Sequence, residues 1–358
     1  MEGRIAFLPG DGVGPEVLAE ARRVLEAIGE AYGHRFEIIE GAMGAGAIES
    51  TGESLPEPTR ELVSQVDAVL LGAVGFATQP TDPTVTDPAK GLLDLRKLLG
   101  NYANIRPVAV SDAILDRSPF RAEHIRGVDL VVVRELLGGI YYGLPRGLDH
   151  GIAHNTEVYT EEEVRRISKT AFEIARERRK KVVSIDKSNV LESSVLWRRV
   201  ATDVAREYAD VEFSSMLVDN CAMQLIANPR QFDVILTNNI FGDILSDEAS
   251  VLAGSLGMLP SASIGGTVGL YEPVHGTAPD IAGKGIANPI GAILSVAMML
   301  ELTFKLSAEA TAIRAGVDRA LAEGCRTADL RSDGNGQATS TSEMGEFIVG
   351  SLAASKAS

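Results

Sequence analysis

Strand-like apolar runs alternate with helical stretches along most of the 358-residue chain, and this alternation constrains the fold more than any other feature. The expected strands are residues 5–8, 36–39, 67–71, 128–133, 182–185, 212–218 and 232–237. A helix is expected at about 15–28, and Thr160 with Glu163 forms a capping box that begins a helix reaching about residue 180. The pattern predicts an α/β protein with a mostly parallel central sheet.

The composition narrows the classes of partner. A net charge of -15 and a pI near 4.9 argue against binding to nucleic acid or to an anionic membrane. The apolar stretch near 286–300 is too short to span a bilayer and predicts a buried helix. Cys221 and Cys325 form no disulfide framework, and the chain starts without an apolar targeting segment. We therefore expect a cytoplasmic protein.

Asp243 and Asp247 follow the strand at 232–237 and lie four positions apart in a segment with helical periodicity, so they share one helix face. Two like charges on one face favour a divalent cation between them, held by carboxylate oxygens. The alternative is that both acids only complement the positive end of the helix.

Other charged residues lie where strands end, which is where open α/β sheets bind ligands. Arg134 closes the strand at 128–133, Lys187 follows the strand at 182–185, and Asp219 follows the strand at 212–218. Arg96 and Arg106 add two guanidinium groups, which can hold carboxylates in a bidentate manner. Taken singly, each arginine could equally form a surface ion pair.

Two glycine-rich segments are candidates for ligand contact. Residues 10–15 (Gly-Asp-Gly-Val-Gly-Pro) resemble a dinucleotide-binding fingerprint, but the third glycine comes one position early and Pro15 interrupts the pattern. Residues 275–289 predict a long irregular loop whose backbone could contact a flat or phosphorylated ligand, or which merely connects two elements. The Pro- and Asp-rich residues 79–90 are expected to form a surface loop.

Several motifs together resemble the metal-dependent β-decarboxylating dehydrogenases of the isocitrate/isopropylmalate family over nearly the whole chain. The motifs are residues 10–16, 95–97, 104–107, 134–135, 139–143, 186–190, 239–247 and 275–289. One departure is Ala89, where many isopropylmalate enzymes of the family carry Glu.

The resemblance implies the family's two-domain α/β fold, which is not a Rossmann fold. Residues 1–101 with 254–358 would form the first domain, and residues 102–253 the second. The second domain would include a β-arm at 138–154 and the interface of a homodimer whose active sites are shared between subunits.

The resemblance also implies roles for individual residues. Tyr141 and Lys187 would be the catalytic acid and base, and Arg96, Arg106 and Arg134 would clamp the substrate carboxylates. Asp219, Asp243 and Asp247 would bind Mg²⁺ or Mn²⁺, with Asp219 and Lys187 donated by the second subunit and Asp219 also near the substrate. Leu92 and Leu93 would receive a branched alkyl group, unless they face the core.

The expected cofactor is NAD, bound by the loop at 275–289. The expected cofactor-binding residues are His275, Gly276, Thr277, Ala278, Pro279, Asp280, Ile281 and Asn288. An acid at position 280 suits ribose hydroxyls and repels a 2′-phosphate. The implied reaction is oxidative decarboxylation of 3-isopropylmalate in leucine biosynthesis. Tartrate, D-malate, isocitrate and homoisocitrate are alternative substrates, and a non-catalytic regulatory subunit is an alternative of another class.

Overall fold

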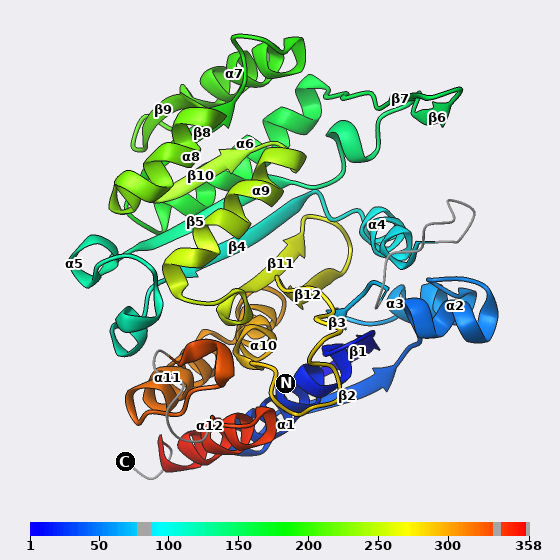
Figure 1. Cartoon of the computed structure of the whole chain (residues 1–358), viewed down its shortest axis with the longest axis vertical. Helices are drawn as coiled ribbons and strands as arrows, with labels where there is room; N and C mark the ends of the chain where they lie inside the picture. The colour runs from blue at the N-terminus through cyan, green and yellow to red at the C-terminus, as the bar shows by residue number, and fades with distance from the viewer. Residues whose placement is uncertain (77–86, 332–337, 356–358) are drawn as a thin grey trace. The chain divides into compact units, whose positions relative to one another are not determined.

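The computed structural model describes residues 1–76, 87–331 and 338–355 and divides into two compact units (Figure 1). The first unit is Met1–Asn101, Ser111–Ser118 and Ala253–Ser358, and the second is Tyr102–Val110 and Pro119–Leu252. The sequence division kept 102–253 together, whereas residues 111–118 group with the first unit. Ile114 and Leu115 are buried there, and Arg326 pairs with Asp116 at 3.0 Å.

The strands of the first unit lie in the order β2-β1-β3-β12-β11. Their bounds are β1 Glu2–Gly10, β2 Arg35–Glu40, β3 Ala68–Ala73, β11 Pro260–Ile264 and β12 Gly269–Pro273. β1 pairs in parallel with β2 and β3, β3 pairs in parallel with β12, and β11 is antiparallel to β12. In a Rossmann order the third strand would lie beside the second, so this sheet is not Rossmann-wound.

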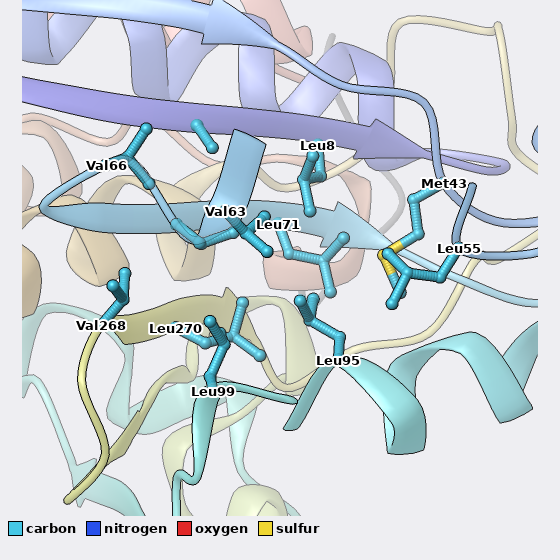
Figure 2. Packing of buried hydrophobic residues seen from close by; sticks show 12 residues of the cluster. Leu8, Met43, Leu55, Val63, Val66, Leu71, Leu95, Leu99, Val268 and Leu270 are labelled. Atoms are coloured by element: carbon cyan, nitrogen blue, oxygen red, sulfur yellow. The ribbon is translucent and has the colours of Figure 1, made fainter. Parts of the chain in front are cut away.

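Helices cover both faces of this sheet. α1 (Gly14–Tyr32), α10 (Ile290–Leu302), α11 (Ser307–Ala322) and α12 (Thr341–Ser355) pack together on one face. On the other face, α3 (Glu57–Val63) and α4 (Pro88–Leu99) enclose an aliphatic cluster (Figure 2), and α2 (Ala45–Thr51) precedes α3. Alternate residues of β1 and β3, such as Leu8 and Leu71, point into that cluster and meet Leu95 of α4 because strand side chains alternate between faces.

The second unit has the strand order β4-β5-β10-β8-β9. The bounds are β4 Ala103–Ala109, β5 Asp129–Glu135, β8 Lys181–Asp186, β9 Glu212–Leu217 and β10 Val234–Thr237. β5, β10, β8 and β9 are parallel, and β4 is antiparallel to β5. α6 (Glu161–Arg176) and α7 (Glu192–Ala205) cover one face and α8 (Val218–Ala227) covers the other, as right-handed crossovers between parallel strands require. α9 (Asn239–Ser250) packs beside α8.

The predicted α/β class with mostly parallel strands is therefore confirmed. The capping box at Thr160 is present, although α6 ends at Arg176 rather than near residue 180. The stretch near 286–300 forms the buried helix α10 from Ile290 onward, and no described helix is long and apolar enough to cross a bilayer. The expected surface loop at 79–90 lies largely outside the described residues, and α4 already begins at Pro88.

Three strands and part of one segment differ from the sequence interpretation. β4 was not predicted because Pro107, which lacks an N–H donor, argues against a strand interior. β11 and β12 were not predicted because each is only five residues long and lies beside glycines, which are uncommon in strands. Within the expected arm at 138–154, only β6 (Gly147–Asp149) and β7 (Ile152–His154) form an antiparallel hairpin, whereas Gly139–Tyr141 is a 3-10 turn.

Candidate active site

The two carboxylates of α9 lie on one face of the helix, as the spacing predicted. The Asn238 side chain caps the helix by accepting a hydrogen bond from Phe241 N at 2.9 Å. α9 begins at Asn239, so Asp243 lies in its second turn rather than its first. The Asp243 and Asp247 side chains are 36% and 58% exposed, which leaves both able to take a ligand from solvent.

Two buried arginines of neighbouring strands meet these carboxylates. Arg134, at the end of β5, donates from Nη1 to Asp243 Oδ1 at 2.5 Å. Arg106, in β4, lies 3.5 Å from Asp243 and 3.4 Å from Asp247. Both guanidinium groups are almost fully buried. Buried charges require partners, so this corner of the unit is built around charge pairing.

Asn239 and Gly242 position the Arg134 side chain. Asn239 Oδ1 accepts hydrogen bonds from Nε and Nη2 of Arg134, at 3.1 and 2.8 Å, while its amide group donates to the Leu136 and Gly138 carbonyls. A Cβ on Gly242 would lie 2.6 Å from Arg134 Cγ, so the arginine stem occupies space that any other residue would fill. The sequence motif contains both residues, but only the structure reveals this support.

Tyr141 joins the same cluster from the 3-10 turn. Its hydroxyl donates to Asp243 Oδ2 at 2.8 Å, and the Arg134 guanidinium lies 5.7 Å from its ring centroid. Burial raises the pKa of Tyr141, and the Asp243 carboxylate raises it further. The phenol is therefore held in its protonated form, ready to donate.

The carboxyl group of Asp247 has a raised pKa. Partial burial raises the pKa of Asp247, Arg106 opposes that rise, and the Asp243 carboxylate adds to it. The rise therefore comes mainly from burial, and a cation bound beside the two carboxylates would favour the charged form of both.

Lys187 and Asp219 lie together elsewhere in the second unit. Lys187 follows β8, Asp219 begins α8, and Nζ lies 2.6 Å from Oδ1. The hydrogen bond from Lys187 holds the pKa of Asp219 below its usual range. Asp186 pairs instead with Arg198 at 2.8 Å, so Lys187 does not serve merely to neutralise its neighbour.

Asp219 does not join Asp243 and Asp247 within one chain. Across residues 1–76, 87–331 and 338–355, no cluster of three or more His, Cys, Asp or Glu side chains could hold a metal ion. The α9 pair nevertheless offers oxygen donors of the type that Mg²⁺ and Mn²⁺ prefer. The donor chemistry thus fits a divalent ion that takes a further ligand from another source.

The irregular loop at 275–289 belongs to the first unit. Its Asp280 side chain is exposed, and the backbone at Ala278, Gly283 and Gly285 has positive φ values of 38°, 73° and 64°. His275 Nδ1 bonds to the Gly276 carbonyl at 2.9 Å, while the buried Nε2 has no hydrogen-bond partner among the described residues. Burial lowers the pKa of His275, so the neutral ring presents an acceptor that a ligand hydroxyl or amide could satisfy.

Other residues of the expected cofactor set have differing environments. Thr277 and Asn288 are buried, Ala278 and Ile281 are half-buried, and Gly276 and Pro279 are exposed. The Asn288 amide donates to Asp329 at 3.0 Å, and its oxygen accepts from Ile290 N at 3.0 Å. Asn288 thus supports the end of the loop.

Arg96 and the two leucines lie on α4 in the first unit. Arg96 is buried and donates from Nη2 to Glu272 of β12 at 2.7 Å. Leu92 packs against the aliphatic cluster of the first unit, whereas Leu93 is half-buried and does not belong to that cluster. Sequence reasoning missed Glu272, because β12, the strand that carries it, was itself not predicted.

The isocitrate/isopropylmalate dehydrogenase family model matches residues 4–348, and the chain belongs to this family. The similar solved structures include isocitrate dehydrogenase from Methylococcus capsulatus, at a TM-score of 0.86 and 35% identity over 98% of this chain and 99% of that one. A β-decarboxylating dehydrogenase from Thermococcus kodakarensis in its apo form matches at 0.78 and 38%, over 98% and 96%.

Two curated relatives that are similar to this chain are named 3-isopropylmalate dehydrogenase. The 3-isopropylmalate dehydrogenase of Shouchella clausii (strain KSM-K16) is 53% identical over 365 residues, covering 100% of both chains. The 3-isopropylmalate dehydrogenase of Aquifex aeolicus (strain VF5) is 54% identical over 335 residues, covering 92% of each. The likeness is therefore to whole enzymes rather than to a shared domain.

Proposed function

We propose that this protein catalyses the NAD-dependent oxidative decarboxylation of (2R,3S)-3-isopropylmalate to 4-methyl-2-oxopentanoate and CO2, a step of leucine biosynthesis. The observation that carries the proposal is the whole-length identity, above one half, to relatives named 3-isopropylmalate dehydrogenase. The solved isocitrate dehydrogenase is less similar, at 35%. The charged cluster around Asp243 gives the proposal its chemistry.

The substrate carboxylates would be bound by Arg106 and Arg134 of the second unit, and by Arg96 of the first. Arginine suits this task because its planar fork matches the two oxygens of a carboxylate. Arg96 now bonds to Glu272, and Arg134 to Asp243. When a diacid binds, its carboxylates would replace Glu272 and Asp243 as partners of these arginines, or would bind the arginines together with them.

The alkyl group of the substrate would contact Leu93 more than Leu92. Leu92 packs partly into the core cluster, as the alternative interpretation of these leucines had it, so Leu93 is the better candidate for a pocket wall. Burying an isopropyl group contributes roughly 1.5–3 kcal/mol, whereas a third carboxylate beside leucine would stay unpaired. This contrast favours isopropylmalate over isocitrate.

Asp243 and Asp247 would hold Mg²⁺ or Mn²⁺, with Asp219 of a second copy as a further ligand. When bound, the ion polarises the C2 oxygen and stabilises negative charge there. Arg106 and Arg134 keep the two carboxylates in place. Lys187 would accept the C2 hydroxyl proton, and Tyr141 would donate a proton to the enol carbon after CO2 leaves.

NAD would bind on the loop at 275–289 and accepts hydride from C2 when bound. The exposed Asp280 carboxylate suits the two adenosine ribose hydroxyls and repels a 2′-phosphate, which favours NAD over NADP. The buried acceptor His275 Nε2 offers a further contact.

A homodimer with shared active sites is part of the proposal, with residues 102–253 forming its interface. Exposed apolar side chains support it: Leu148 and Ile152 of the hairpin are 74% and 70% exposed, and Met223 of α8 and Ile244 of α9 are 60% and 59% exposed. Such groups in an acidic protein are expected at a surface that another subunit covers. A second copy would also supply Lys187 and Asp219.

The proposal is tested by comparing turnover of 3-isopropylmalate, D-malate, tartrate, isocitrate and homoisocitrate with NAD or NADP and Mg²⁺. The expected order has 3-isopropylmalate with NAD first. A preference for isocitrate would overturn the assignment of the leucines. An intact dimer that forms no NADH with any of these acids would point to the regulatory-subunit alternative.

A further inference from the structure

The turn at residues 10–16 does not have the order of a dinucleotide fingerprint, yet it holds the loop at 275–289 in place. Glu16 lies in the first turn of α1. Its Oε1 accepts from Gly283 N at 3.1 Å, and its Oε2 accepts from Gly285 N at 3.0 Å. One carboxylate therefore binds two loop amides at once.

The backbone of the loop at Gly283 and Gly285 is suited to binding an anion. Gly283 and Gly285 have φ values of 73° and 64°, in the left-handed region that favours glycine. Backbone amides that converge in this way form a concave site for negative charge. In this chain an internal carboxylate, Glu16, fills that site instead of a ligand.

The same turn also holds the other side of the loop. Val13 N donates to the Thr277 carbonyl at 2.9 Å, and a Cβ on Gly12 would lie 2.1 Å from that oxygen. Thr277 lies three residues before Asp280, and Gly283 lies three residues after it. The tip that carries the exposed Asp280 is thus anchored on both sides to one short segment.

Asp11 makes that segment rigid. Its carboxylate accepts from the amides of Ala45, Gly46 and Gly75 at 2.8–3.2 Å. The turn is therefore fastened to the body of the first unit before it reaches the loop. Rigid support of this kind lowers the ordering entropy that a ligand must overcome.

We propose that Glu16 is a positioning residue for the dinucleotide: its carboxylate holds the Gly283–Gly285 amides and so presents Asp280 in its binding geometry. This inference rests on the proposed binding of NAD to the loop. Glu16 itself touches no reacting atom. Its loss is expected to weaken NAD binding and to leave the chemical step unchanged.

The test compares Glu16→Ala and Glu16→Gln with wild type and with Glu30→Gln, a control at an exposed position of the same helix. NAD affinity is measured by direct titration of the free enzyme, and KM for NAD and for 3-isopropylmalate is measured separately. We expect Glu16→Ala to raise the Kd of NAD about tenfold, because two charge-assisted hydrogen bonds are lost. Glu16→Gln keeps one acceptor oxygen, so a rise of about threefold is expected.

Amide hydrogen exchange in the absence of NAD gives a second readout. Exchange at 281–286 should accelerate in Glu16→Ala and change less in Glu16→Gln, while kcat at saturating NAD stays within about twofold. If Glu16→Ala folds poorly, the Glu16→Gln variant decides the question through the same two measurements.

The outcomes separate the two proposals. A wild-type enzyme that binds no NAD overturns the proposed function. Wild-type binding with unchanged Kd and unchanged loop exchange in the Glu16 variants overturns the positioning role. Equal losses in kcat and in both KM values would mean general destabilisation and would also overturn it.

Discussion

The charged cluster on α9 and the loop at 275–289 are built in opposite ways. The cluster uses buried arginines, carboxylates and a phenol whose protonation states depend on one another. The loop uses backbone amides, left-handed glycines and one carboxylate that comes from α1. Charge shapes the first region, and backbone conformation shapes the second.

The difference reflects the ligands proposed for each region. A small diacid and a divalent ion carry concentrated charge, which only fixed opposite charges can match in a partly buried site. A dinucleotide is large and has many weak contacts, so a preformed surface serves it better than strong charges. Mutations should therefore separate the two regions kinetically.

The largest effect is expected from Lys187→Ala. Removal of the base should lower kcat by about 10²–10⁴-fold while 3-isopropylmalate and NAD still bind. Single-turnover kinetics with binding titrations would measure both. Lys181→Ala serves as the control, since Lys181 lies at the start of β8 and pairs with Glu212 of the neighbouring strand β9. Turnover near the wild-type value would contradict the assignment of the base.

Gly12→Ala should damage the loop selectively. The added Cβ meets the Thr277 backbone oxygen at 2.1 Å, and φ of 59° costs a non-glycine residue roughly 1–2 kcal/mol. We expect the Kd of NAD to rise about thirtyfold, with a smaller change in KM for 3-isopropylmalate. Gly46→Ala, where a Cβ meets nothing within 4 Å, is the control.

Gly242→Ala should weaken binding of 3-isopropylmalate and leave binding of NAD unchanged, the reverse of Gly12→Ala. Its Cβ displaces the Arg134 stem, and overpacking of this kind costs typically 1–3 kcal/mol. KM for 3-isopropylmalate should rise about tenfold, and the Kd of NAD should stay constant. Gly350→Ala, at an exposed position with open space in α12, is the control. Equal effects on both ligands would break the contrast between the regions.

The smallest effect is a pH dependence of NAD binding. Burial lowers the pKa of His275, so the ring is neutral at pH 7 and gains a proton only as the pH falls through that lowered value. Protonation removes the Nε2 acceptor, and NAD affinity should fall by about threefold in mildly acidic buffer. Titrations of wild type and His275→Asn across pH 5–8 would measure it. A curve of the same shape for both proteins would exclude His275 as the cause.

The sequence alone predicted the parts of this molecule that periodicity and residue chemistry determine. Asp243 with Asp247, the capping box at Thr160 and the parallel strands all followed from spacing. β4 could not be predicted, because Pro107 contradicts a strand until the antiparallel partner β5 is known.

Support between distant residues was equally inaccessible. The contacts of Glu16 with Gly283, and of Glu272 with Arg96, join positions 267 and 176 residues apart. The fingerprint-like turn illustrates the gap: Gly12 is required by the close approach of Thr277, whereas Gly10 and Gly14 are required by the backbone at Ala73 and Pro9.

Anchoring at Thr277 and Gly283 fixes both ends of the tip through residues that lie outside the tip itself. Under the proposed function, we expect substitutions at 280 and 281 to alter which dinucleotide is accepted, while the contacts of Val13 and Glu16 with the loop stay the same. A change of dinucleotide preference in the course of evolution would then need few substitutions.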